Sequence, residues 1–251
     1  MSRPQRPHNI AIRPLTVEDL PQVLALERHG FPRHEQASPR GLEYRLTVCP
    51  ELCCGVFLRT FDTEAIESEK LPLKSTIKSE RLIAHVIATK MYSNKITDEA
   101  MEIPKDFKTL YVNKDNSGLL KEELVPDFGL NEEPAPADPL PASTNATHPP
   151  GHTDAGSTIG IHGVIVHNEF RGMKIASLML KDYLQRMGQQ YLADDVALIC
   201  KSELVKLYQS VGFQDLGISD CHFGGEEWHD MRARLENEDE QDEDDDEGSA
   251  N

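Results

Sequence analysis

A buried strand that leads through a tight turn into an amphipathic helix constrains the fold of this sequence more than any other feature. Residues 159–167 form an almost continuous apolar run, which predicts a buried strand. Apolar side chains then recur at helical spacing on one face, at Ala176, Met179, Leu180, Tyr183, Leu184 and Met187. Shorter patterns predict a strand over 196–200, a helix over 204–211, and strands over 213–218 and 227–235. This alternation predicts an α/β fold in which helices lie on both faces of a mixed sheet.

The N-terminal part of the chain supplies further elements of the same domain. An alternating run over 10–14 predicts a strand, and Thr16 with Asp19 predicts the start of a helix that ends before Pro32. A second helix is predicted over 40–48, followed by strands over 52–61 and 81–91. The polar residues between these two strands are typical of a hairpin loop.

Composition separates the folded body from its appendages. Seven of the 16 prolines lie in residues 105–158, and a segment of this kind buries too little apolar area to offset its ordering entropy. Ten of the 43 acidic residues lie in residues 236–247. We therefore predict a flexible N-terminus over 1–9, one domain built from residues 10–104 and 159–235, a disordered insertion over 105–158 and an acidic disordered tail over 236–251. The tail is either a solubilising extension or an attachment site for a basic protein.

Charge and apolar patterning exclude several classes of partner. The net charge is -17 and no basic stripe is present, so nucleic acid is not an expected partner. No apolar run approaches the roughly 18 residues that cross a bilayer, and the N-terminus does not resemble a signal sequence. We therefore expect no membrane association and a cytoplasmic location. The five cysteines favour reduced, buried thiols, because their number is odd and most lie in apolar runs, and their spacing does not predict a metal site.

The turn after the buried strand has the character of an anion-binding site. The first turn of a helix has unpaired backbone N–H groups and the positive end of the helix dipole, which together suit a pyrophosphate. Judged by its local pattern alone, the segment 164–177 fits an ordinary strand-to-helix turn equally well.

The same turn reads Arg-Gly-Met-Lys-Ile-Ala over residues 171–176, which resembles the Q/R-x-x-G-x-G/A loop of the GNAT acetyltransferase superfamily. Residues 46–52, 162–171 and 207–213 are similar to segments of arylalkylamine N-acetyltransferases, and 13–19 and 30–32 look closest to their fungal polyamine-acetylating branch. The resemblance implies a GNAT-like fold, with a mixed, mostly antiparallel central sheet, and acetyl-CoA as cosubstrate. The residues that it implies for CoA binding are Val164, Ile165, Val166, Arg171, Gly172, Met173, Lys174, Ile175, Ala176 and Ser177.

Two positions depart from the family pattern. Lys174 stands where the loop has its central glycine, and a left-handed backbone there would cost a lysine about 1 kcal/mol relative to glycine. Gly160 stands at one of two positions that are histidines in the animal enzymes, and the other position is His162. The resemblance therefore implies a relay with a single histidine.

Acetyl transfer to an amine needs one group that accepts a proton and one that donates a proton. Only a neutral amine attacks a thioester, so a base must take the ammonium proton, and the resemblance implies His162 as this base. It implies Tyr208 as the acid that protonates the departing thiolate. From the residues alone, two alternatives stay open: His162 is a structural histidine of the strand, and Tyr208 is an aromatic residue of the core.

The resemblance also implies groups for the oxyanion and for the amine. A bulge eased by Gly163 would expose the backbone N–H of Val164 to the thioester carbonyl. The family's acceptor contacts correspond to Phe31, Pro32, Ile161 and Ile199. His34 and Glu35 follow Phe31 and Pro32 closely in sequence. They either contact a cationic substrate or are ordinary loop residues.

These features imply an enzyme that transfers acetyl from acetyl-CoA to the primary amine of a small arylalkylamine or polyamine, by direct attack in a ternary complex. Two other functions stay open: acetylation of protein N-termini or lysines, and an interaction protein that merely binds CoA. A covalent route through Cys200 is disfavoured, because apolar surroundings raise the pKa of a thiol.

Overall fold

The computed structural model describes residues 4–62, 76–104, 107 and 150–235 of the 251-residue chain. Within these ranges seven strands form one sheet in the order β1-β2-β3-β4-β5-β7-β6. Only β4 and β5 are parallel among the described neighbours, and the other pairs are antiparallel. The strands are β1 (Ile10–Pro14), β2 (Cys54–Phe61), β3 (Ile77–Met91), β4 (Thr158–Val166), β5 (Asp195–Cys200), β6 (Gln214–Ile218) and β7 (His229–Arg234).

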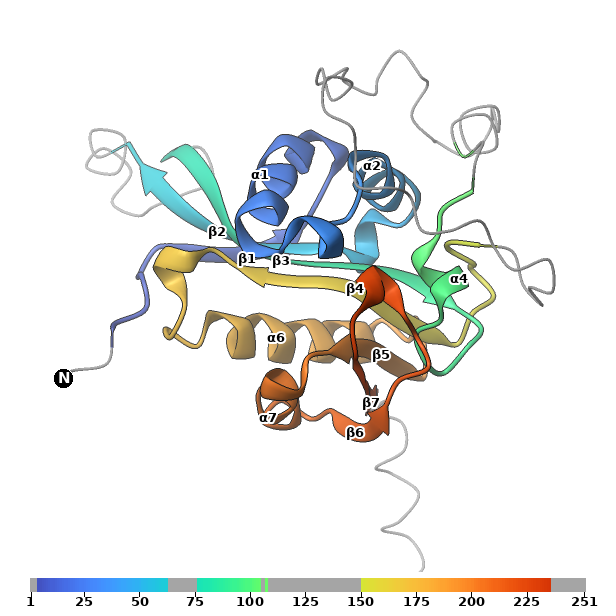
Figure 1. Ribbon diagram of the computed structural model, residues 1–251. Coiled ribbons are helices and arrows are strands. Elements are labelled where there is room, and N and C mark those ends of the chain that lie inside the picture. Colours follow the sequence, from blue (N-terminus) through green and yellow to red (C-terminus); the bar gives the residue numbers. More distant parts are fainter. Residues whose placement is uncertain (1–3, 63–75, 105–106, 108–149, 236–251) are drawn as a thin grey trace, which may run out of the picture.

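Helices cover both faces of this sheet (Figure 1). One face carries α1 (Leu20–Gly30) and α2 (Pro39–Val48), and the other carries α6 (Ile175–Gln189) and α7 (Val205–Gln209). A short helix, α4 (Asp98–Met101), follows β3. The predicted fold class, a mixed and mostly antiparallel sheet between helices, is therefore confirmed. Single turns of 3-10 helix complete the described elements: η1 (Val17–Asp19), η2 (Arg33–Glu35), η3 (Pro50–Leu52), η7 (Asn168–Phe170), η8 (Ser202–Leu204) and η9 (Phe223–Gly225).

Local sequence signals explain where α1 and α2 begin. The backbone N–H of Thr16 donates to Asp19 at 2.9 Å, and Arg13 forms an ion pair with the same carboxylate at 2.8 Å. Ser38 caps α2 by accepting the N–H of Gly41 at 3.0 Å. Pro39 follows at the first helical position, where its missing N–H costs nothing.

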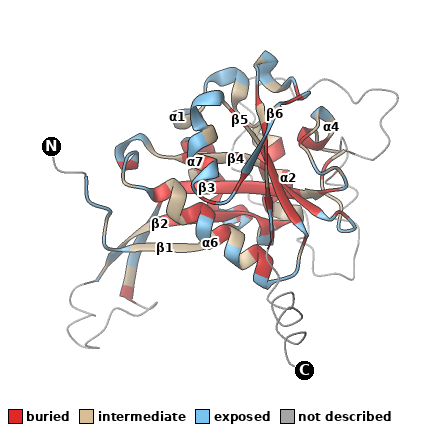
Figure 2. Cartoon of the chain, turned by 90° about the horizontal axis from the view of Figure 1, so that it is seen from below, coloured by how far each residue is buried: buried red, intermediate tan, exposed pale blue. Residues whose placement is uncertain are grey.

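The core has two main layers, one on each side of the sheet. The layer that we call the α6-side core includes Val86, Ile159, Met179, Leu180 and Met231, and the α1-side core includes Leu20, Leu24, Leu42, Phe57 and Ile87. A smaller cluster on the α1 side of the sheet, the α4 cluster, contains Met91, Ile96, Ala100, Met101, Ala197 and Cys221. Figure 2 shows the central strands largely buried between their helices. This burial accounts for the nearly continuous apolar runs of β3 and β4.

Residues 150–158, which composition assigns to the insertion, lie against the domain. The N–H of His152 donates to the hydroxyl of Tyr44 at 2.8 Å, and that of Thr153 donates to the carbonyl of Lys90 at 3.0 Å. Phe107 is buried edge-on against the ring of Tyr44, with the ring centroids 5.3 Å apart. The rest of the predicted insertion, the centre of the predicted hairpin loop and the acidic tail lie outside the described residues.

All five cysteines are free and buried, as the sequence predicts. Burial raises the pKa of each thiol, and that of Cys200 reaches about 12. No helix among the described residues is long and apolar enough to cross a membrane.

Candidate functional site

The two parallel strands separate at the end where β4 leads toward α6. Their pairing runs from Thr158 with Asp195 to Ile161 with Leu198 and stops there, although β4 continues to Val166. From His162 onward the edge of β4 is therefore not paired with β5. In open α/β sheets, ligands bind where the connections of neighbouring strands diverge at their carboxyl ends. The gap between β4 and β5 is such a place.

A bulge lies in β4 at the point where the two strands separate. Ile87 of β3 pairs with Gly163, and the next residue, Ala88, pairs with Ile161. His162 is therefore the extra residue of β4, and it has no counterpart on β3. The bulge expected beside Gly163 is present in the structure.

The bulge changes which residues of β4 face each side. Ile161 packs in the α6-side core, and without a bulge the alternation would place Ile165 there too. Instead Ile165 packs in the α1-side core, while Val164 contacts the α6-side core. The imidazole of His162 therefore projects to the α1 side at the only described register shift of β4.

His162 is held by two side chains on this face. Its Nε2 atom lies 2.7 Å from Oγ1 of Thr89, and its Nδ1 atom lies 3.1 Å from Sδ of Met101. Burial lowers the pKa of His162 well below its ordinary value of 6.5, and the charge of Arg45 lowers it further. The imidazole is therefore neutral at physiological pH, and the same environment makes it a weaker base than a free imidazole.

Glu27 on α1 is a titratable group at this site that the sequence analysis did not identify. Its Oε2 accepts the N–H of Ala37 at 3.3 Å, and its Oε1 lies 3.5 Å from Nε2 of the buried His85. A Cβ atom added to Gly163 would lie 3.3 Å from the same Oε1, so the carboxyl group reaches the bulge. Burial raises the pKa of Glu27 to about 7, with the Ala37 hydrogen bond and Arg45 acting against this shift. A pKa near the working pH suits a proton acceptor.

A sequence signal for Glu27 does exist. Leu20, Val23, Leu24 and Glu27 are spaced as one helical face, and the first three are buried in the α1-side core. A carboxylate on an apolar stripe is unusual, because burial of an unpaired charge is costly. That conflict marks Glu27 as a candidate functional residue.

Tyr208 lies on α7 within the α6-side core, and it is 5% exposed. Its ring packs edge-on against Phe213, with centroids 5.7 Å apart, and its hydroxyl has no hydrogen-bond partner among the described residues. Burial raises its pKa above the ordinary value, with a smaller contribution from Cys200, so the phenol is protonated at neutral pH. Tyr208 and His162 make no direct contact, because they lie on opposite faces of the sheet beside the gap.

The loop between β4 and α6 turns sharply in an exposed position. Gly172 and Lys174 both have left-handed backbone conformations, with φ of 78° and 59°. Nε of Arg171 donates to the carbonyl of Val166 at 3.2 Å, which ties the loop to the end of β4. α6 begins at Ile175, so the N–H groups of its first turn open toward the loop.

Replacement of Lys174 by glycine is expected to stabilise the protein by about 1 kcal/mol, because a left-handed conformation strains every residue that has a Cβ atom. Urea denaturation of the two proteins measures this difference. Tyr191, with φ of 52° at the other end of α6, is the matched site, and Tyr191→Gly should stabilise in the same way. A Lys174→Gly protein that is less stable than the parent would contradict the assignment of strain to this residue.

The four predicted acceptor contacts fall on both sides of the sheet. Phe31 packs against the α1-side core directly after α1, and Pro32 is exposed beside it. Ile199 packs against the α4 cluster on the same face as His162. Ile161 instead lies in the α6-side core. The structure thus brings Phe31, Pro32 and Ile199 to the α1 face and places Ile161 behind the sheet.

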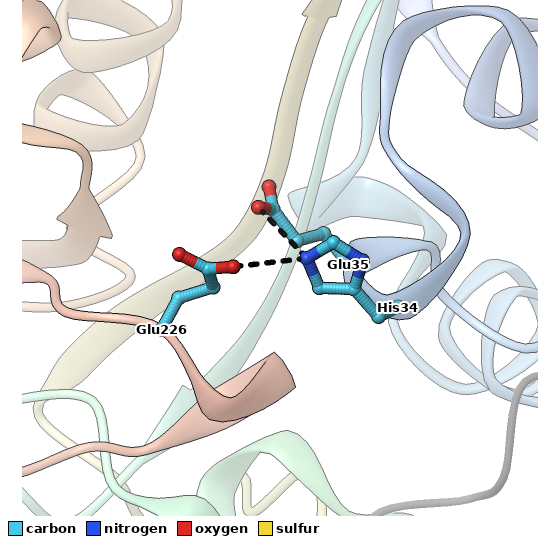
Figure 3. A group of neighbouring side chains, drawn as sticks. All are labelled: His34, Glu35 and Glu226. Atoms are coloured by element: carbon cyan, nitrogen blue, oxygen red, sulfur yellow. Dashed lines mark hydrogen bonds and ion pairs between the residues drawn. The ribbon is translucent and has the colours of Figure 1, made fainter.

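His34 and Glu35 of η2 form a charged cluster with the loop that precedes β7 (Figure 3). Nε2 of His34 lies 3.1 Å from Glu226 and 3.6 Å from Glu35. Nζ of Lys201, directly after β5, lies 3.1 Å from Glu35 and 2.8 Å from Glu226. The positions of these side chains resemble those of metal ligands, but the Lys201 ammonium already forms ion pairs with both carboxylates. The cluster therefore joins η2 to the segment around Glu226.

A second imidazole at Gly160 would have to displace neighbouring side chains. A Cβ atom at this position would lie 2.9 Å from Sδ of Met91 and 3.0 Å from Cδ1 of Ile96. Both residues belong to the α4 cluster, which occupies the space beside β4. The observed packing of the α4 cluster therefore fits glycine at this position, and a second histidine would require it to repack.

Comparisons with known proteins agree with this architecture. Residues 135–235 match the family model described as the acetyltransferase (GNAT) domain. The serotonin N-acetyltransferase of Mesocricetus auratus is 24% identical over 219 residues, which span 85% of this chain and 73% of that protein.

Solved structures share the fold. The loading GNATL domain of CurA from Lyngbya majuscula superposes with a TM-score of 0.53 at 11% identity, covering 90% of this chain and 98% of that one. The GphF GNAT-like decarboxylase in complex with isobutyryl-CoA gives a TM-score of 0.50 at 15% identity, covering 90% of this chain and 100% of that one. Residues 135–235 thus match the acetyltransferase (GNAT) domain model, and the fold of the described residues is that of the GNAT-like structures. Because the GNAT fold hosts more than one reaction, the fold alone does not identify the acceptor of this protein, which depends on the residues of the site.

Proposed function

We propose that this protein transfers acetyl from acetyl-CoA to the primary amine of a small arylalkylamine or polyamine. The observation that carries the proposal is the gap between β4 and β5. At one end of the gap lies the loop that joins β4 to α6, residues 167–174, which we call the α6 loop, and the His162 bulge lies beside it. Acetyl-CoA bound in this gap would have an anion site for its diphosphate, unpaired strand backbone along its extended arm, and titratable groups beside its thioester.

Acetyl-CoA binding is assigned to two adjoining segments. The diphosphate is held by the N–H groups of residues 172–177 and the helix dipole, with Arg171 and Lys174 adding positive charge. The amide-containing arm lies along residues 164–166, whose edge is free of β5. These are the residues that the family resemblance implies.

The acetyl transfer begins when the amine loses its proton. An alkyl ammonium has a pKa of roughly 10.4, so a base must remove the proton before nitrogen attacks the thioester carbonyl. We assign this role to His162, whose neutral imidazole is in contact with Thr89 and lies on the face that carries three of the four proposed acceptor residues. Glu27 is the second titratable group at the bulge, and its pKa of about 7 suits proton uptake.

The second half of the reaction breaks the C–S bond. Attack by nitrogen places negative charge on the carbonyl oxygen, and the N–H of Val164 beside the bulge is the assigned donor. The tetrahedral intermediate then expels the CoA thiolate, which takes the phenolic proton of Tyr208. The nitrogen loses its second proton to water as the amide forms, and a proton from water restores the phenol. The acetyl amide and free CoA are the products, and no covalent enzyme intermediate forms.

The charged cluster favours a small amine over a peptide. His34 and Lys201 link η2 to Glu226, and a Cβ atom at Gly224 would lie 3.0 Å from the carbonyl oxygen of His34. The segments that flank the acceptor side are therefore in direct contact. An extended peptide would need an open groove between them.

A thiol-release assay with the full chain tests this proposal. The acceptors are an indolyl-ethylamine, a phenylethylamine, spermidine, a lysine peptide and a peptide with a free N-terminus, and acetyl-CoA alone is the control. We expect at least one small amine to exceed both peptides about 100-fold in kcat/KM. Preference for a peptide would identify a protein acetyltransferase instead. No release with any acceptor would favour a protein that only binds CoA.

A further inference from the structure

The segment before β1 lies against the α6 loop and forms an open pocket with it. The pocket has a volume of about 530 Å³ and is lined by residues 4–8, Ile10 and residues 172–174. Cγ of Pro4 lies 4.0 Å from the position that a Cβ atom of Gly172 would occupy. Ligand pockets usually have volumes of roughly 300–1,000 Å³, so the space suits a group of nucleotide size.

The lining of this pocket is positively charged in a strongly acidic protein. Arg6, His8 and Lys174 line it, and no aspartate or glutamate does. Neither Arg6 nor Lys174 forms an ion pair within the described part of the chain. The chain as a whole has a net charge of -17. Two unpaired cations facing one pocket favour an anionic ligand.

Apolar groups line the same pocket between the charges. Pro4, Pro7, Ile10 and Met173 contribute these groups. A ligand that combines a flat apolar ring with phosphate groups would use both kinds of surface. The nucleotide end of CoA has this chemistry, because it carries an adenine ring and a phosphomonoester on the 3′ oxygen of its ribose.

We propose that Pro4–His8 completes the cosubstrate site and that Arg6 binds the 3′-phosphate of CoA. This inference rests on the proposed function, which places the diphosphate at the neighbouring residues 172–177. The N-terminal segment then forms a second wall of the site and meets the nucleotide where it leaves the α6 loop. Arg6 suits the task, since its guanidinium donates two parallel hydrogen bonds to a phosphate.

Calorimetric titration of the full chain with CoA and with 3′-dephospho-CoA tests the assignment. We expect the parent protein to bind CoA about tenfold more tightly than dephospho-CoA, as a charge-assisted bidentate contact would give. Arg6→Ala should weaken CoA binding about tenfold and leave dephospho-CoA binding within about twofold. Lys181→Ala is the matched control, because it removes one exposed cation from α6 outside the pocket.

The outcomes separate this inference from the proposed function. If the parent binds neither ligand, the acetyl-CoA site itself is wrong. If the parent binds CoA and Arg6→Ala binds it equally well, only the role of Arg6 is overturned. An Arg6→Ala protein that loses the same factor for both ligands would show that Arg6 does not recognise the 3′-phosphate.

Discussion

Replacement of His162 by alanine is expected to lower kcat for acetyl transfer by roughly 10² to 10⁴, the range typical of a lost general base. The affinity for acetyl-CoA should change little, because the imidazole projects to the α1 side, away from the α6 loop. Steady-state kinetics at saturating amine measures the first effect, and calorimetric titration measures the second.

A matched histidine shows whether such a loss is specific to the bulge. His152 is also largely buried, and its Nδ1 accepts the N–H of Lys90 at 3.1 Å. His152→Ala should therefore cost stability but retain kcat in the folded protein. Equal kcat values for His162→Ala and the parent would exclude His162 as the base.

The pH dependence of kcat distinguishes His162 from Glu27. Because the pKa of His162 is lowered well below 6.5, a reaction that uses it as base should show no acidic limb at 6.5. Glu27 has a pKa raised to about 7, so a reaction that depends on its ionised form should lose rate as the pH falls through about 7. A limb near that value that disappears in Glu27→Gln would transfer the role of base to Glu27.

Replacement of Tyr208 by phenylalanine should lower kcat by roughly 10² or more, because the departing thiolate then lacks its proton donor. The stability of the protein should stay nearly constant. The ring keeps its contact with Phe213, and the hydroxyl has no hydrogen bond to lose within the described structure. Single-turnover measurement of thiol release isolates the step concerned.

Tyr183→Phe is the control for this experiment. Its hydroxyl donates to the carbonyl of Leu52 at 2.9 Å in the same core, so the variant should lose about 1 kcal/mol of stability. Its kcat should match that of the parent. A Tyr208→Phe protein that behaves like Tyr183→Phe would reduce Tyr208 to a packing residue.

Local patterns in the sequence account for much of the fold. The apolar run of β4 and the helical stripe of α6 predict the strand, the turn and the helix. Such periodic patterns depend only on residues that are close in sequence, so they can be recognised without the tertiary structure. The left-handed conformation considered for Lys174 is present, with φ of 59°. The strand predicted over 81–91 in fact begins at Ile77. Its first residues are mostly polar and so carry no apolar pattern, but their backbone pairs with β2.

The finer geometry of the site depends on contacts between distant residues. The bulge at His162 is a property of the register between β3 and β4, which no local pattern records. Because of that register, Ile161 packs in the α6-side core, whereas Ile199 of β5 packs against the α4 cluster. The space beside Gly160 is closed by Met91 and Ile96 from another part of the chain. Family resemblance supplies residue identities, but it does not supply these orientations.

The sealed cysteines have a practical consequence for measuring this enzyme. All five thiols are buried in the folded chain, and burial raises their pKa values, so they stay protonated at neutral pH. Aromatic disulfide dyes react with thiolates that they can reach. Colour that develops in a native reaction mixture therefore reports the coenzyme set free at each turnover, with little background from the catalyst itself.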